Sequence, residues 1–141
     1  MNVTRFRSKL EDALAEPASV QIEHASLEEC LNLLAKKVRA KHDTFTIKIV
    51  GNDLKLEGIT RNQVIRDYAA TDKPVAEILT DLVLRADPSS GTKDPSDPEL
   101  RLIWIVAANP DDAEKLAILI TTRAAAAKRG DKLPKMFHSP K

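Results

Sequence analysis

The sequence predicts an α+β fold of two βαβ-like halves, whose two main helices pack on small mixed sheets. Three observations lead to this fold class. A helix start signal at Ser26 opens an amphipathic stretch, residues 44–50 alternate apolar and polar side chains, and the apolar stripe that begins at Leu27 recurs from Val75. A C-terminal β-hairpin and short helices at both ends complete the expected architecture.

The chain begins with a predicted amphipathic helix. Between residues 4 and 15, apolar side chains recur at helical spacing with charges between them, and Pro17 closes the segment. The apolar positions are Phe6, Leu10, Ala13 and Leu14. We expect residues 1–17 to form an N-terminal helix or linker outside the main core, and residues 18–130 to form a single domain.

The first half is a predicted strand, helix and strand. Residues 20–23 alternate as a half-buried strand does, and Ser26 and Glu29 then stand at the spacing of a capping box. Residues 44–50 predict the second strand, which residues 51–53 end, while residues 54–60 stay open between a helical turn and a short strand. The expected buried positions of the helix are Leu27, Cys30, Leu31, Leu34 and Val38, and those of the second strand are Phe45, Ile47 and Ile49.

The second half repeats the helix pattern. Asp72 followed by Pro74 predicts a capped helix start, and the helix should end near residues 87–88. When Leu27 is laid on Val75, the apolar positions of the two helices coincide. The second helix should bury Val75, Ile78, Leu79, Leu82 and Val83.

The C-terminal part predicts a hairpin after a loop. Residues 87–98 hold three prolines and no large apolar side chain, so we expect a mobile loop. Residues 100–107 are apolar on both faces, which predicts a strand at the centre of a sheet. Residues 109–112 form a turn, residues 116–122 a second strand, and residues 124–128 a short helix ended by Gly130. Residues 131–141 should be a flexible tail.

Composition and spacing argue against catalysis and cofactors. The formal net charge is +1, and Cys30, the single cysteine, excludes an intramolecular disulfide. His24, His42 and His138 lack metal-ligand spacing, and the four glycines form no phosphate-binding pattern. Acidic pairs at residues 28–29 and 111–112 follow cap-like positions, and the longest apolar run, residues 102–108, is too short to span a membrane. We therefore expect no enzyme activity, no cofactor and no metal.

The candidate contact residues are basic. A cluster near the C-terminus can contact phosphate or an acidic protein surface, although no aromatic side chains for base stacking are interleaved with it. Its members are Arg123, Lys128, Arg129 and Lys132, with Lys135 beside them. We expect a protein partner or self-association through a strand edge or helix packing. The alternative is a KH-like domain that binds single-stranded RNA through this patch, although the Gly-x-x-Gly loop of such domains is missing.

A family resemblance points the same way. Ser26-Leu27-Glu28-Glu29-Cys30-Leu31, between its two strands, resembles the first half of the short N-terminal domain shared by secretins and TonB-dependent transporters, with cysteine in an alanine position. Residues 118–130 resemble the endings of uncharacterised planctomycete proteins that carry such a domain at their C-terminus. The resemblance covers about residues 20–120. It implies a non-enzymatic interaction module of the periplasm or cell envelope. A start without an apolar signal region is expected of an intracellular protein or of a piece of a longer exported chain.

Overall fold

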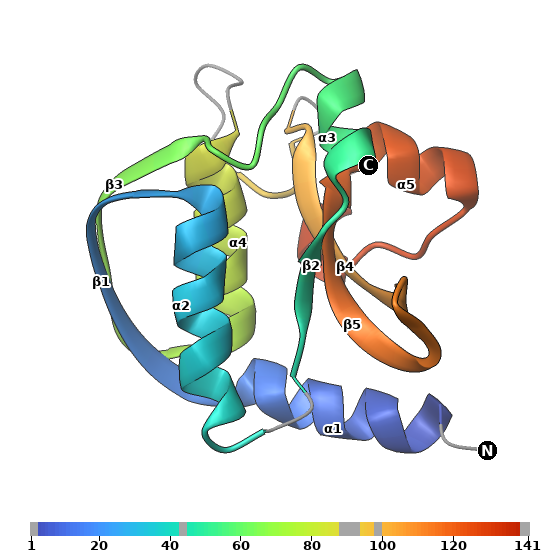
Figure 1. The fold of residues 1–141 in the computed structure, drawn as a ribbon, viewed down its shortest axis with the longest axis horizontal. Coiled ribbons are helices and arrows are strands. Elements are labelled where there is room, and N and C mark those ends of the chain that lie inside the picture. The colour runs from blue at the N-terminus through green and yellow to red at the C-terminus, as the bar shows by residue number, and fades with distance from the viewer. Residues whose placement is uncertain (1–2, 43–44, 88–93, 98–99, 139–141) are drawn as a thin grey trace.

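The protein is built in three layers, with two helices between a two-stranded ribbon and a three-stranded sheet (Figure 1). The computed structural model describes residues 3–42, 45–87, 94–97 and 100–138. The ribbon is β1 (Pro17–Ser26) with β3 (Val64–Pro74), the helices are α2 (Leu27–Arg39) and α4 (Val75–Ala86), and the sheet is β2 (Ile47–Ile49), β5 (Asp112–Thr122) and β4 (Leu102–Asn109). The predicted α+β class is confirmed.

Each half of the chain crosses from one sheet to the other. β1 leads directly into α2 and then β2, and β3 leads directly into α4 and then β4. The first strand of each half lies in the ribbon and the second in the three-stranded sheet, so the two strands of a half do not share a sheet as they do in a true βαβ unit. The recurring stripe is real, because α2 and α4 bury the predicted positions between the two sheets.

The start of α4 differs from its prediction. Its N-cap is Pro74, and no side chain caps it. Asp72 instead belongs to β3, where it has a positive φ of 49° and donates its backbone N–H to Ser19 Oγ (3.0 Å). The register of the β1–β3 ladder shifts at this point. Asp72 is therefore part of an irregularity in the ribbon and does not cap α4. The capping box at Ser26 is confirmed, with both hydrogen bonds to Glu29 present.

The position of β4 corrects a second prediction. The strand order is β2-β5-β4, so β4 lies at the edge and β5 at the centre, parallel to β2 and antiparallel to β4. Residues Leu102 to Ile105 are buried on both faces nevertheless. One face packs on α4, while α3 (Gly51–Leu56) and α5 (Arg123–Arg129) pack on the other face of the sheet (Figure 1). Helices cover both faces of this sheet, with α3 and α5 contacting β5, so burial of β4 on both faces does not require a central position.

Local structure resolves the remaining elements. Residues 54–60, for which the sequence allowed either a helical turn or a short strand, begin as helix. The helix α3 starts at Gly51, and a turn to Gly58, which has a φ of 71°, follows it. The C-terminal hairpin is confirmed, and Gly130 ends α5 with a φ of 76°. The predicted loop falls mainly on residues 88–93 and 98, which lie outside the described residues. Asp87, at its start, is buried and accepts the backbone N–H groups of Arg101 and Leu102 at 2.7 Å.

Both chain ends contribute to the core. α1 (Val3–Ala15) is the predicted N-terminal helix, yet it packs against α4 and β5, with Leu10 and Ala13 buried. In the segment expected to be a tail, residues Lys135–Phe137 form a 3₁₀ turn. Phe137 is fully buried and meets the Trp104 ring edge to face, with ring centroids 6.1 Å apart. The packing of α1 and the packing of Phe137 place the two described ends of the chain on either side of β4.

Candidate functional site

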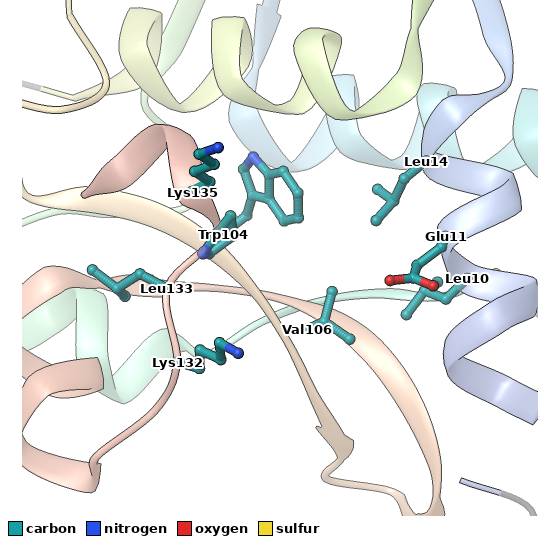
Figure 2. A pocket seen from close by; sticks show the side chains of 9 residues that line it. Leu10, Glu11, Leu14, Trp104, Val106, Lys132, Leu133 and Lys135 are labelled. Atoms are coloured by element: carbon teal, nitrogen blue, oxygen red, sulfur yellow. The ribbon is translucent and has the colours of Figure 1, made fainter. Parts of the chain in front are cut away.

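A groove of about 310 Å³ opens over β4, between α1 and the segment that follows α5 (Figure 2). β4 contributes Trp104 and Val106 to it. In Figure 2 the side chains of α1 stand beside Val106, and those of the C-terminal segment stand on the Trp104 side. The other lining residues are Leu10, Glu11 and Leu14 from α1, and Lys132, Leu133, Pro134 and Lys135 from the C-terminal segment.

The groove lies beside a free strand edge. Arg101 accepts the backbone N–H of Arg123, so the odd-numbered residues of β4 turn their polar groups toward β5 and the even-numbered residues turn theirs outward. Trp104 is only 3% exposed, whereas Val106 is partly exposed and Ala108 is exposed. In the part of the chain that the structure describes, no backbone hydrogen bond joins this outer edge to another segment. Among the described residues, the outward backbone groups of Val106 are thus unpaired, and its side chain lines the groove.

The floor of the groove is held rigidly. The Trp104 indole donates from Nε1 to Thr80 Oγ1 (3.0 Å), and the Thr80 hydroxyl donates to the carbonyl of Ala76 (2.8 Å). Phe137 packs edge to face against the Trp104 ring. Because the ring is fixed by a hydrogen bond and by packing, the shape of the groove is set before anything binds.

The rim of the groove carries opposite charges on its two sides. Glu11 stands on α1, and Lys132 and Lys135 stand on the C-terminal segment (Figure 2). All three side chains are exposed, and within the described residues none makes a hydrogen bond or ion pair. They are therefore available to charged groups of a ligand.

The predicted basic cluster is divided by the fold. The Arg123 guanidinium is part-buried and donates to the carbonyls of Leu100, Phe137, Pro95 and Asp97, and burial lowers its pKa. It therefore joins the C-terminal segment to the loop before β4. Its donors are used within the molecule.

Arg129 is also engaged internally. It pairs with Asp53 (2.8 Å) and Asp131 (2.9 Å). Burial opposes its charge, but the hydrogen bonds to Asp53 and Asp131 outweigh burial, and the pKa of Arg129 is raised. Of the four predicted contact residues, Lys128, Arg129 and Lys132 are exposed, and only Lys132 lines the groove.

The cysteine and histidine side chains, which are the residue types that could act as a nucleophile or bind a metal, lie in the core or make local contacts. Burial raises the pKa of the Cys30 thiol to about 11, so the thiolate is scarce at neutral pH. His42 lies 3.3 Å from Glu16, and His138 contacts the carbonyl of Leu133. Among the described residues, no three His, Cys, Asp or Glu side chains are grouped so as to hold a metal ion. No helix in the described ranges has the length and apolar character needed to cross a membrane.

Comparison with other proteins adds no relative. The chain matches no family model, no curated protein and no solved structure.

Sequence reasoning had missed Glu11, Trp104 and Val106 as site residues. The alternation of β4 showed which side chains share a face, but a site at its edge depends on α1 and the C-terminal segment, which are distant in sequence.

Proposed function

We propose that this chain is a non-enzymatic protein-interaction module that binds an extended segment of a partner protein along the free edge of β4. The observation that carries the proposal is that the outward backbone groups of Val106 and Ala108, which bond to no other described segment, lie beside an apolar groove lined by the side chain of Val106. A strand added to an open edge gains main-chain hydrogen bonds, and its alternate side chains enter neighbouring pockets.

Two further features support this function. The groove is apolar at its floor and charged only at its rim, which suits a partner side chain held by burial and oriented by charge. The interaction role is also the one that the resemblance to the secretin and TonB-dependent transporter domain implies. The RNA-binding alternative relies on the basic patch of Arg123, Lys128, Arg129 and Lys132, and two of these four side chains, Arg123 and Arg129, are engaged in contacts within the molecule.

A substitution at the edge tests the proposal directly. Val106→Pro removes an N–H that points away from β5, so the sheet keeps its hydrogen bonds while an added strand loses one and meets the proline ring. We expect peptides selected from a displayed random library on the wild-type chain to bind Val106→Pro at least tenfold more weakly, a loss of about 1.4 kcal/mol. Ala108→Pro provides a second edge variant should Val106→Pro disturb the fold.

The control lies elsewhere on the surface. Leu56→Ser removes an exposed apolar side chain of α3, 80% exposed, and should leave the affinity of the selected peptides unchanged. Circular dichroism and the amide NMR spectrum check that each variant is folded. Selected peptides that bind both proline variants as tightly as the wild type would refute docking at β4.

A further inference from the structure

We infer that the β4 groove selects an extended peptide with a basic residue, an apolar residue and an acidic residue at alternate positions, read from its N-terminus to its C-terminus. This inference rests on the proposed function and specifies the partner of the same site. It follows from the positions of Glu11, Lys132 and Lys135 around an apolar floor.

The charges on the rim are complementary to such a segment. Glu11 stands at the Val106 side of the groove, and the two lysines stand at the Trp104 side (Figure 2). A bound segment therefore places a basic side chain near Glu11 and an acidic side chain near Lys132 and Lys135. Because the three rim charges make no ion pair among the described residues, pairing with the peptide costs no ion pair within that part of the chain.

Strand geometry sets the spacing of the three peptide residues. Alternate side chains of a strand point to the same face, so residues i, i+2 and i+4 all face the groove when the backbone pairs with β4. The central one lies over Val106 and the floor, where burial favours an apolar side chain. The outer two then reach the opposite sides of the rim.

The direction of the peptide follows from antiparallel pairing. Antiparallel ladders are slightly more stable per residue than parallel ladders. β4 runs from its Trp104 side to its Val106 side, so an antiparallel peptide enters at Val106 and leaves at Trp104. Its basic residue therefore comes first and its acidic residue last.

Two peptides of equal composition test the order of charges. The forward peptide is acetyl-Ser-Lys-Thr-Leu-Thr-Glu-Ser-amide, and the swapped peptide exchanges its Lys and Glu. Titration into the ¹⁵N-labelled chain should shift the amides of Val106 and Ala108, and the forward peptide should bind roughly three- to tenfold more tightly, the range for two or three exposed ion pairs. This preference should shrink in high salt, because exposed charges are screened.

Charge-reversed variants provide the decisive comparison. In Glu11→Lys/Lys132→Glu/Lys135→Glu the preference should invert, so that the swapped peptide binds more tightly. Lys128→Glu, on the exposed part of α5, changes the net charge by the same amount and should keep the wild-type preference.

The outcomes separate this inference from the proposed function. Equal affinity of both peptides, with shifts at Val106 and Ala108, overturns the charge order and leaves strand docking intact. The opposite preference in the wild type overturns the antiparallel direction. Absence of shifts with either peptide overturns the inference, while the library selection with Val106→Pro decides independently whether strands dock at this edge.

Discussion

The carboxylate of Asp53 joins two outer helices to the sheet. Its Oδ2 accepts the Thr121 hydroxyl of β5 (2.5 Å) and the Arg129 guanidinium of α5 (2.8 Å), while Asp53 itself belongs to α3. The Asp53 side chain is 12% exposed and that of Arg129 is 41% exposed. The pair is thus half-buried, and its strength lies between that of a surface ion pair and that of a buried one.

Removing this carboxylate should destabilise the fold. Asp53→Ala leaves the buried Thr121 hydroxyl without its acceptor and Arg129 without its buried partner, so we expect the free energy of unfolding to fall by about 1–3 kcal/mol. Urea denaturation measures this loss. Asp131→Ala removes the more exposed partner of Arg129 and should cost less than about 1 kcal/mol. Equal losses in the two variants would show that Asp53 has no special role.

Glu16 links the junction of α1 and β1 to the end of α2. Its carboxylate contacts His42 (3.3 Å) and Lys41 (3.2 Å). The hydrogen bond with His42, followed by that with Lys41, holds the pKa of Glu16 below its ordinary value of 4.5. A carboxyl group whose pKa is lowered in the folded state stabilises the protein above its unfolded pKa and loses that contribution as the pH falls through the folded value.

This sign predicts an acid-dependent effect of Glu16. Glu16→Gln should be less stable than the wild type at about pH 5.5, and the difference should disappear as the pH falls to about 3, because protonated glutamate and glutamine are then equivalent. Thermal unfolding across this range measures the difference. In a Lys41→Gln/His42→Gln background the pH-dependent difference should largely vanish. A difference that stays constant with pH would contradict the role of these contacts.

At the scale of elements, a side-chain cap fixes where α2 begins, and side-chain contacts tie α4 to the ribbon. The α2 capping box satisfies backbone donors on both sides of its first turn, with Glu29 N–H donating to Ser26 Oγ and Ser26 N–H to Glu29 Oε1. α4 is tied to the ribbon through Asp81, which accepts the Tyr68 hydroxyl (2.6 Å) and the Lys73 ammonium (2.5 Å). Each helix is therefore oriented by a polar contact as well as by its buried stripe.

Loss of the α2 cap should cost a measurable part of the stability. Ser26→Ala removes the acceptor for Glu29 N–H, and we expect the free energy of unfolding to fall by about 0.5–2 kcal/mol. Lys36→Ala, at an exposed position of the same helix, should change it by less than about 0.5 kcal/mol. Denaturant midpoints of the two variants provide the comparison. An equal effect would mean that the cap does not stabilise α2.

At the scale of the whole molecule, the chain ends close the structure around β4. α1 supplies Leu10 and Ala13 to the core, and the C-terminal segment supplies Phe137. The Arg123 guanidinium fastens that segment by donating to the carbonyl of Phe137 (2.7 Å). The same two segments form the walls of the groove, so the proposed binding site exists only when both ends are in place.

Truncating the buried aromatic ring should therefore affect stability and binding together. Phe137→Ala leaves a cavity against Trp104, and we expect the free energy of unfolding to fall by about 3–5 kcal/mol. Peptides selected on the wild type should also bind less well, because Lys132 and Lys135 lose their support. Lys135→Ala should leave stability within about 0.5 kcal/mol. An unchanged unfolding transition in Phe137→Ala would show that the segment does not belong to the core.

The extent of sequence-based prediction differed between fold and site. The start of α2, the end of α5 at Gly130, the buried stripes and the hairpin were predicted because capping and periodicity depend on residues close in the chain. Of the candidate site, sequence reasoning identified Lys132, and it assigned Arg123 and Arg129 to a surface that they do not form. Their carbonyl and carboxylate partners are distant in sequence, so no local pattern revealed that these two cations are used internally.

The sequence alone determined the α+β class, the two amphipathic helices and their recurrence, since each depends on the spacing of neighbouring side chains. Only the tertiary structure decided that β4 lies at the edge of its sheet, that the strands of each half separate into two sheets, and that both ends of the chain enclose a groove. Strand order depends on long-range hydrogen bonding between β2, β5 and β4, and an apolar strand has the same pattern whether another strand or a helix buries it.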